Sequence, residues 1–299
     1  MGMGDAEAGR FAPPGAVGLV VHPGRPDAME AARRVTALLL DMGIKVVGCA
    51  DDLWSAEVEG IELRPSSDFC EGIDVVLSMG GDGTFLRAAY WSRERSALLL
   101  GVNLGRLGFL SEVEAAELPW AARRIVAGDF DVEERMTLAV EVTDAYGRVS
   151  ATSWALNEAS VERTVPQRLV VLEACVGDMK FARIPADAVI CASPTGSTAY
   201  AFSAGGPILS PLVDAILLVP VAPHTLFSRT LVVDPTETLS LRCVGGDNDC
   251  VVTCDGRESI PVPPGGRVRV GRGDRPVRLV RLRPFSFYKR VRDKFGLSV

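Results

Sequence analysis

Several features that would tie this chain to a membrane or to nucleic acid are absent from its sequence. The longest apolar stretches, such as residues 215–222, fall far short of the roughly 20 residues that a membrane-spanning helix needs. Residues 1–16 lack the apolar core of a secretory signal, and we expect them to form a mobile leader. The net charge of −6 argues against a nucleic-acid partner, which requires a concentrated basic face. These absences predict a cytoplasmic protein with no nucleic-acid or membrane partner.

The sequence also lacks the side chains of a protein-bound metal site. It has two histidines, and none of its seven cysteines stands in a CxxC pair. Cys250 and Cys254 are close in sequence, but no second pair completes a tetrahedral zinc site. We therefore expect no metal held by the protein's own side chains, and we expect reduced cysteines, as in a cytoplasmic protein.

The first part of the sequence alternates buried strands with amphipathic helices. Residues 17–21, 74–79 and 98–102 are nearly all apolar, which is typical of parallel strands covered on both faces. Residues 28–42 carry apolar side chains at helical spacing and are followed by Gly43. This order predicts an α/β domain built on a parallel, Rossmann-like sheet.

The pattern changes near Glu133, after which short apolar runs are separated by glycine, proline and aspartate. Such punctuation predicts a domain rich in β-strands. The last residues turn helical and basic, and the aromatics within 284–288 would form a sticky patch if they were exposed. We therefore predict a leader at 1–16, an α/β domain at 17–132, a β-rich nucleotide-binding domain at 133–283, and a tail at 284–299 that returns to the α/β domain.

A glycine-rich loop, residues 80–84 (Gly-Gly-Asp-Gly-Thr), follows a predicted parallel strand and opens a helix. Ligands bind at this edge of open α/β sheets, and glycines let backbone amides approach a polyphosphate at a helix N-terminus. A carboxylate beside phosphates is repelled by their charge, so its presence there indicates a chemical role. We therefore expect Asp82 to accept a proton from an attacking hydroxyl or to hold magnesium. The alternative is a tight turn in which Asp82 caps the helix.

A second glycine-containing loop, residues 101–110, follows the next predicted strand, which ends at Asn103. Arg25 lies on the loop after the first strand. The carboxyl ends of parallel strands share one edge of the sheet, so we expect Arg25 to contact phosphate there. The sequence has neither a Walker A loop nor a GxGxxG fingerprint. The alternative for residues 101–110 is a purely structural loop.

Two polar segments interrupt the strands of the β-rich part. Asn157 and Glu158 close an apolar run, and together they supply donors and acceptors suited to ribose hydroxyls. Residues 193–207 combine small hydroxyl residues, glycines and Tyr200, which predicts a hydrogen-bonding surface with room for a planar base. The alternatives are a common loop dipeptide and a turn rich in serine and threonine.

The motifs at 80–84, 101–110, 157–158, 193–207 and 255–256 occur in the order and approximate spacing of bacterial NAD kinases, and the chain resembles that family from about residue 17 to 295. GGDGT is shared with diacylglycerol and sphingosine kinases and, as GGDG, with phosphofructokinases. The run PTGSTAY followed by GGP is much more specific. A diacylglycerol-type lipid kinase and an NAD(P)-sensing regulator stay open as alternatives.

The resemblance implies an enzyme, an ATP-dependent transferase that phosphorylates the adenosine-ribose 2′-hydroxyl of NAD to give NADP, with Asp82 as the catalytic acid–base residue. It implies Mg²⁺ or another divalent metal carried with ATP, and a homo-oligomer, either a dimer or a tetramer. The phosphate loop would comprise Gly80, Gly81, Gly83, Thr84, Arg25 and Asn103. The NAD site would comprise Asp82, Gly83, Arg87, Asn157, Glu158, Arg168, Asp187, Thr195, Thr198, Ala199, Tyr200, Ala201, Phe202, Ser203 and Ala222.

The chain departs from the family at two positions. Ala188 stands where the family usually has glycine, and Ser193 where it has threonine. An alanine reaches glycine-only backbone conformations at a cost, so we expect an altered backbone beside Asp187. The family's arginine shortly before that aspartate is also not in place, and Arg183 is the nearest one.

Overall fold

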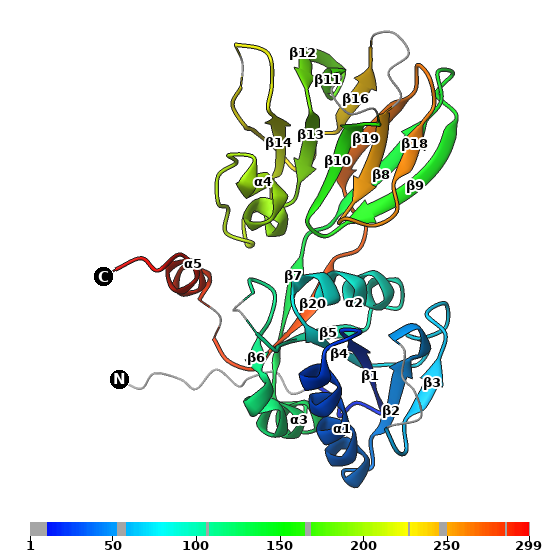
Figure 1. The fold of residues 1–299 in the computed structure, drawn as a ribbon, viewed down its shortest axis with the longest axis vertical. Helices are drawn as coiled ribbons and strands as arrows, with labels where there is room; N and C mark the ends of the chain where they lie inside the picture. Colours follow the sequence, from blue (N-terminus) through cyan, green and yellow to red (C-terminus); the bar gives the residue numbers. More distant parts are fainter. Residues whose placement is uncertain are drawn as a thin grey trace, which may run out of the picture. The chain divides into compact units, whose positions relative to one another are not determined.

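The computed structural model describes residues 11–52, 58–105, 108–164, 169–226, 228–244, 250–284 and 286–298. The chain divides into two compact units (Figure 1). The first unit runs up to Glu134 and resumes at Val277, and the second comprises Arg135–Pro276.

The first unit is built on one sheet with strand order β3-β2-β1-β4-β5-β20-β7, and β6 pairs with β5. The pairings of β1 with β2 and β4, and of β5 with β4, β6 and β20, are parallel. The strands are β1 (Ala16–Val21), β2 (Lys45–Cys49), β3 (Glu62–Arg64), β4 (Val75–Gly80), β5 (Leu98–Asn103), β6 (Val113–Glu114), β7 (Asp131–Arg135) and β20 (Val277–Arg281).

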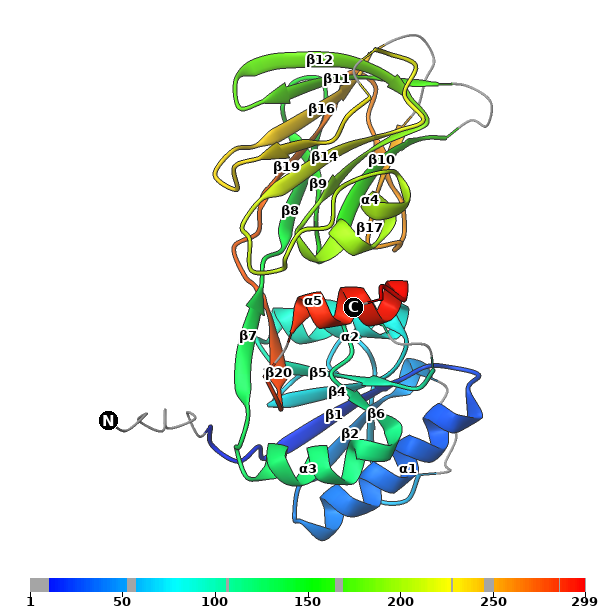
Figure 2. The ribbon, with the colours of Figure 1, turned by 90° about the vertical axis from the view of Figure 1, so that its left-hand side faces the viewer.

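Helices cover both faces of this sheet. As a result, β1, β4 and β5 are buried along their whole length. α1 (Pro26–Asp41) and α3 (Leu118–Val126) pack on one face, and α2 (Asp82–Glu94) packs on the other (Figure 2). The predicted α/β unit with a parallel sheet is confirmed. The sequence pattern did not reveal α3, a short helix that begins at Leu118-Pro119.

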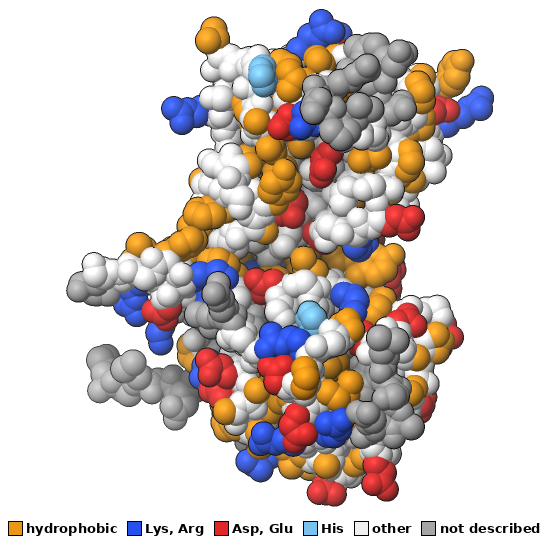
Figure 3. Space-filling view, in the orientation of Figure 1, with side chains coloured by type: hydrophobic (Ala, Val, Ile, Leu, Met, Phe, Trp, Pro, Cys, Tyr) orange, Lys and Arg blue, Asp and Glu red, His pale blue; other side chains and the backbone are white. Residues whose placement is uncertain are grey.

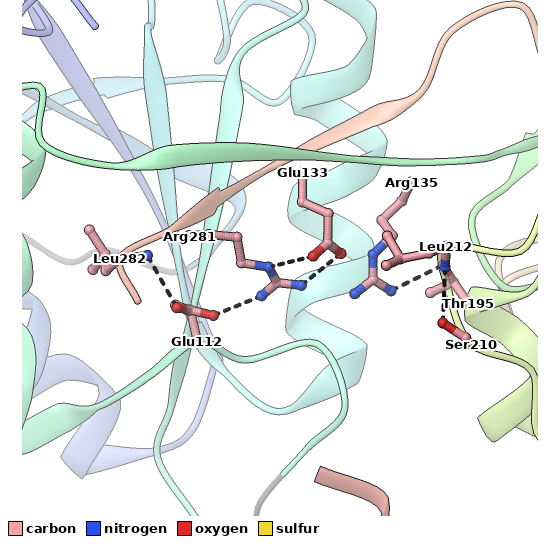
Figure 4. Close-up of polar contacts among 8 residues, drawn as sticks. All are labelled: Glu112, Glu133, Arg135, Thr195, Ser210, Leu212, Arg281 and Leu282. Carbon is pink, nitrogen blue, oxygen red and sulfur yellow. Dashed lines mark hydrogen bonds and ion pairs between the residues drawn. The ribbon is translucent and has the colours of Figure 1, made fainter. Parts of the chain in front are cut away.

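The apolar run 277–282 was assigned to the β-rich domain, but residues 277–281 instead form β20, which pairs in parallel with β5. A buried ion network holds this strand (Figure 4). Arg281 donates to both oxygens of Glu133, at 3.0 and 3.1 Å, and to Glu112 Oε2 at 2.8 Å. The C-terminal segment therefore returns to the first unit earlier than expected. An apolar strand does not reveal which sheet it joins, because its partner is distant in the sequence.

The second unit is a sandwich of two antiparallel sheets, as the β-rich prediction requires. Their orders are β15-β14-β13-β10-β17-β18 and β12-β11-β16-β19-β8-β9, and one core cluster draws side chains from both sheets. The strands are β8 (Leu138–Thr143), β9 (Val149–Ala155), β10 (Glu158–Arg163), β11 (Val170–Val176), β12 (Met179–Ala186), β13 (Ala188–Ala192), β14 (Ile216–Val221), β15 (Leu231–Val233), β16 (Leu239–Cys243), β17 (Cys250–Cys254), β18 (Ile260–Val262) and β19 (Arg267–Arg272).

Two further features complete the fold. A short 3₁₀ turn (Thr195–Thr198) and α4 (Tyr200–Ser203) follow β13, and α5 (Phe287–Phe295) ends the described chain. On the face drawn in Figure 3, acidic and basic side chains are interspersed over both units. No helix in the described ranges combines the length and the apolar composition of a membrane-spanning segment.

Candidate active site

The glycine loop of the first unit lies at the carboxyl end of β4, where α2 begins. Gly81 and Gly83 are exposed, and a Cβ added at either one would meet nothing within 4 Å. Gly80 differs, because a Cβ there would lie 2.3 Å from Thr84 Oγ1. Gly81 and Gly83 therefore leave open space along the backbone, whereas Gly80 packs tightly against the buried Thr84.

Asp82 is the first residue of α2, and Gly81 is the N-cap. The Asp82 carboxylate turns to the loop after β5: Phe109 N donates to Oδ2 at 3.4 Å, and a Cβ at Gly108 would lie 2.3 Å from Oδ1. The helix-cap alternative is therefore not what the structure shows. The negative charge in the first turn of α2 is favoured by the helix dipole, and the half-buried carboxylate keeps access to solvent.

Arg25 and Asn103 come to the same edge of the sheet but are engaged locally. Arg25 pairs with Asp27, with Nε 3.0 Å from Oδ1, and also donates to the Leu104 carbonyl. The Asn103 amide donates to Gly105 O at 3.0 Å and accepts from Gly105 N at 3.3 Å. Both side chains thus hold the loop after β5. For Asn103, these contacts agree with the alternative in which residues 101–110 form a purely structural loop.

Arg87 is fixed at the carboxyl ends of β1 and β2. Its Nη2 lies 2.7 Å from the Val21 carbonyl and 2.5 Å from Asp52 Oδ1, and the guanidinium lies over the Trp91 ring at 5.5 Å. Burial raises the pKa of Asp52 to about 6, against the opposing effects of the Val21 amide and Arg87. Sequence reasoning missed Asp52, because an aspartate in the turn after a strand carries no distinctive signal.

The C-terminal helix α5 covers the loop that touches Asp82. Arg290 Nη1 donates to Gly108 O at 3.0 Å, and the Phe109 ring lies 6.4 Å from Phe287 and 6.2 Å from Phe295. Burial lowers the pKa of Arg290. None of the described residues of α5 is buried, so the helix caps a loop and is not part of the core. Phe287 and Phe295 therefore contact this loop, whereas Tyr288 is exposed and Phe285 lies outside the described residues.

In the second unit, Asn157 lies in the turn between β9 and β10, and Glu158 is the first residue of β10. Asn157 is only 6% exposed, and its Oδ1 and the Glu158 Oε2 are buried without a hydrogen-bond partner among the described residues. Burial raises the pKa of Glu158 to about 8, and the charge of Asp255 adds to the shift. Buried acceptors without partners are rare in native proteins, so they indicate a ligand that supplies donors.

The segment after β13 packs directly on this turn. Ser193 N donates to Asn157 O at 2.8 Å, and a Cβ at Gly196 would lie 2.1 Å from that same oxygen. Ser197 Oγ donates to Pro194 O at 2.7 Å and accepts from Leu209 N at 2.9 Å. The small residues that the sequence singled out therefore serve close packing, which brings α4 beside Asn157 and Glu158.

The side chains of α4 divide into buried and exposed. Ala201 is fully buried, whereas Tyr200 is 41% exposed, and Phe202 and Ser203 also face solvent. Burial raises the pKa of Tyr200, and the charges of Glu162, Asp187 and Glu158 add to this effect. The predicted base-binding tyrosine thus lies among carboxylates from β10 and the start of β13.

Asp187 pairs with Arg163 of β10, Nη1 to Oδ1 at 2.6 Å. Asp187 is thus paired with an arginine of a neighbouring strand, which sequence spacing does not reveal. Ala188 begins β13 in ordinary extended backbone and pairs with Val221, so the expected distortion beside Asp187 is absent at this position. Ala222, by contrast, is exposed with φ of +45°.

The remaining predicted residues are placed as follows. Thr195 is buried, and its Oγ1 accepts from Arg135 Nη1 at 3.3 Å (Figure 4). Thr198 donates to Thr195 O at 3.3 Å, and Ala199 is half-buried between the 3₁₀ turn and α4. Arg168, like Arg106 and Leu107 of the loop after β5, lies outside the described residues.

Comparison with known proteins identifies the family. A family model described as the ATP-NAD kinase N-terminal domain matches residues 17–130, and the ATP-NAD kinase C-terminal domain matches residues 156–282. The chain belongs to the ATP-NAD kinase family. The expected resemblance is confirmed, and it decides against the lipid-kinase and regulator alternatives.

Relatives and solved structures agree with this family. NAD kinases of Thermobifida fusca and Rhodococcus erythropolis are each 41% identical, over 291 and 297 residues; both alignments cover 94% of this chain, and 89% and 93% of the relatives. An NAD kinase from Archaeoglobus fulgidus in complex with ATP has a TM-score of 0.70 at 25% identity, covering 94% of this chain and 96% of that one. Yeast NADH kinase complexed with NADH, at 23% identity, shares the fold with a TM-score of 0.86 over 96% of this chain and 88% of that one.

Proposed function

We propose that this chain transfers the γ-phosphoryl group of ATP to the adenosine-ribose 2′-hydroxyl of NAD, producing NADP and ADP. Membership of the ATP-NAD kinase family supports the reaction. The observation that carries the assignment to residues is the pair of buried acceptors, Asn157 Oδ1 and Glu158 Oε2, which have no partner among the described residues. Ribose hydroxyls supply the donors that these oxygens need.

NAD is held, in this proposal, by the second unit. Asn157 and Glu158 bind ribose hydroxyls, and the exposed ring of Tyr200 offers a face for a planar base. Thr195 and Thr198 present hydroxyl groups beside α4, while Asp187 stays fixed by Arg163. The neighbouring members of the proposed set are Ala199, Ala201, Phe202, Ser203 and Ala222, and Arg168 belongs to it from the family resemblance.

Asp82 acts on the attacking group. The 2′-oxygen forms a bond to the γ-phosphorus while the bond from that phosphorus to the β–γ bridging oxygen breaks, and the hydroxyl proton passes to the Asp82 carboxylate. Gly81 and Gly83 leave the backbone open to the triphosphate. General-base help of this kind is worth about 10²- to 10⁴-fold. Phosphoryl transfer has a loose transition state, so positioning and charge neutralisation supply the rest.

A divalent metal would enter with the triphosphate. Among the described residues, no group of three or more His, Cys, Asp or Glu side chains could hold a metal ion. Mg²⁺ commonly keeps several waters and binds through substrate phosphates, so the triphosphate itself would hold it and the Asp82 carboxylate stays available as the base. Bound there, Mg²⁺ would neutralise the charge that develops on the transferred group.

We also propose a cytoplasmic homo-oligomer, a dimer or a tetramer. The family resemblance supports the assembly. Six of the seven cysteines are buried, which agrees with a reducing compartment.

The test is a coupled assay in which an NADP-specific dehydrogenase reports the product. The purified full chain, with ATP, Mg²⁺ and NAD, is expected to form NADP, and reactions without ATP or without NAD are expected to form none. A product phosphorylated elsewhere on NAD would escape the NADP-specific enzyme but appear by mass spectrometry. That outcome, or no phosphorylation of NAD at all, would contradict the proposal.

A further inference from the structure

The carboxylate of Asp255, directly after β17, accepts three backbone N–H groups from a single turn. Oδ2 accepts from Leu156 at 2.7 Å. Oδ1 accepts from Asn157 at 2.8 Å and from Glu158 at 3.1 Å. This turn presents the two buried acceptors assigned above to NAD. We propose that Asp255 is a positioning residue, which fixes the turn so that Asn157 and Glu158 are aimed at the ribose before NAD arrives. The inference rests on the proposed function.

The backbone at Asp255 points to a specific role for its side chain. Asp255 has φ of +51° and Gly256 has φ of +68°, both in the left-handed region. Glycine adopts this region freely, whereas a residue with a Cβ is disfavoured there, although aspartate and asparagine tolerate it better than most. A turn requirement alone would therefore favour glycine at position 255. The carboxylate, with its three amide partners, explains why an aspartate occupies it.

Asp255 is itself held in place. Arg257 Nε donates to Cys254 O at 3.1 Å, and Arg257 Nη2 donates to the Trp154 carbonyl on β9. The guanidinium also lies over the Trp154 ring, 5.3 Å from its centroid. The hairpin that carries Asp255 is thus tied to the strand that leads into the turn. The carboxylate and its amide partners therefore belong to one rigid assembly.

The opposite side of the turn is braced independently. Ser193 N donates to Asn157 O, and Gly196 approaches that oxygen so closely that a Cβ would lie only 2.1 Å away. The backbone of Asn157 is therefore clamped between Asp255 and the segment after β13. Removing Asp255 releases one side of this clamp and leaves three amides without their acceptor. The side chains of Asn157 and Glu158 would then have to be reoriented by NAD at the expense of affinity.

The experiment compares Asp255→Asn with the full-length wild type. Asparagine keeps the shape, but its NH₂ group faces amide donors and its charge is lost. We expect the KM for NAD to rise at least tenfold, with kcat and the KM for ATP changed by less than threefold. Calorimetric titration with NAD should show the same loss of affinity. Asp255→Glu, which keeps the charge but displaces the carboxylate, should raise the KM for NAD by a smaller factor.

Asp144→Asn is the matched control. Asp144 Oδ1 accepts from Tyr146 N at 2.8 Å and from Arg148 N at 2.9 Å in the turn between β8 and β9. This variant loses a similar carboxylate–amide arrangement in the same unit, outside the residues assigned to NAD. Its KM for NAD should stay within twofold of the wild type. A merely structural role of Asp255 predicts that both variants lose thermal stability and that neither changes the KM for NAD selectively.

Two results would overturn the inference. One is a KM for NAD within twofold of the wild type in soluble, folded Asp255→Asn. The other, which needs no variant, is rapid hydrogen exchange of the amides of residues 156–158 in the NAD-free wild type, because a fixed turn protects them. Failure of the proposed function is distinguishable: a wild type that forms no NADP refutes that function, whereas an active wild type with an unchanged Asp255→Asn refutes only the positioning role.

Discussion

The glycine loop of the first unit and the Asn157–Glu158 turn of the second both lie at strand ends, yet they are built in opposite ways. Gly81 and Gly83 are exposed, a Cβ added at either one would meet nothing within 4 Å, and Asp82 contacts the loop after β5 through residues 108 and 109. Asn157 is buried, and its backbone is clamped from two sides. One region leaves space, and the other is closely packed.

This difference teaches how one enzyme can serve two ligands of different character. A triphosphate brings its own charge, water and metal, so an open loop with one accessible carboxylate suffices. A ribose is neutral and must be recognised by its hydroxyls, so the turn keeps desolvated acceptors at fixed positions. The first region is therefore expected to control turnover, and the second to control NAD affinity.

The largest effect should follow from Asp82→Asn. Asparagine keeps the shape and is compatible with a helix start, but it removes both the charge and the base. We expect kcat to fall at least about a hundredfold, within the range that general-base catalysis supplies. The melting temperature should change little, because Gly81 caps α2. Steady-state kinetics and thermal unfolding on one sample check this, and a variant that keeps more than a tenth of kcat contradicts it.

Glu158→Ala should act on the KM for NAD, whereas Asp82→Asn acts on kcat. A hydrogen bond from a ligand hydroxyl to an ionised carboxylate contributes roughly 1.5–3 kcal/mol, so at a pH above the Glu158 pKa of about 8 the KM for NAD should rise about ten- to a hundredfold. The KM for ATP should stay within a few-fold. Glu158 Oε2 has no partner among the described residues, and the carboxyl group accepts a hydrogen bond from the backbone of Tyr200, so thermal unfolding of the variant is measured beside the kinetics. Equal weakening of both substrates would assign Glu158 to the fold instead.

Two neighbouring glycines sharpen the contrast within the first region. A Cβ at Gly81 meets only open space, so Gly81→Ala should keep the wild-type melting temperature while raising the KM for ATP a few-fold. A Cβ at Gly80 would lie 2.3 Å from Thr84 Oγ1, so Gly80→Ala should lower the melting temperature. Kinetics and thermal unfolding of both variants check the pair. An unchanged KM for ATP in Gly81→Ala would contradict binding of the triphosphate at this loop.

The smallest effect concerns the pH dependence of stability. The pKa of Glu158 is raised from 4.5 to about 8, so the folded protein binds more protons than the unfolded chain between these values. The free energy of unfolding contributed by Glu158 therefore falls as pH rises through this window. Glu158→Gln should flatten that dependence, and urea unfolding at pH 5 and pH 8 measures it. Parallel pH dependences of variant and wild type would contradict the shift.

Much of the fold could be predicted because its signals are local. The nearly all-apolar strands β1, β4 and β5 and the β-rich part with its frequent glycines identified both units. The placement of β20 could not be predicted. It begins at residue 277, its partner β5 lies near residue 99, and an apolar pattern does not indicate a partner so distant in the sequence. The tail returns to the first unit, as its aromatics predicted, but they did not reveal how: Phe287 and Phe295 of α5 contact Phe109, and none of the described residues of α5 is buried.

The candidate site divides in the same way. Asp82, Asn157, Glu158 and Tyr200 stand in motifs that can be found by reading along the chain. Asp52, Arg163 and Asp255 act through partners distant in sequence, such as Arg87, Asp187 and the amides of residues 156–158. Of these three, only Asp255 had a signal, the Asp-Gly pair of the family resemblance, and that pair did not indicate what the carboxylate holds.

The division of labour between the two regions is tested most directly by titrating NAD into purified Asp82→Asn in a calorimeter. The account predicts an NAD dissociation constant within about threefold of the wild type, because the proposed NAD contacts of the second unit are intact in a protein that has lost its turnover. A dissociation constant that rises in step with the loss of kcat would contradict the account, and it would place Asp82 among the groups that bind NAD in the ground state.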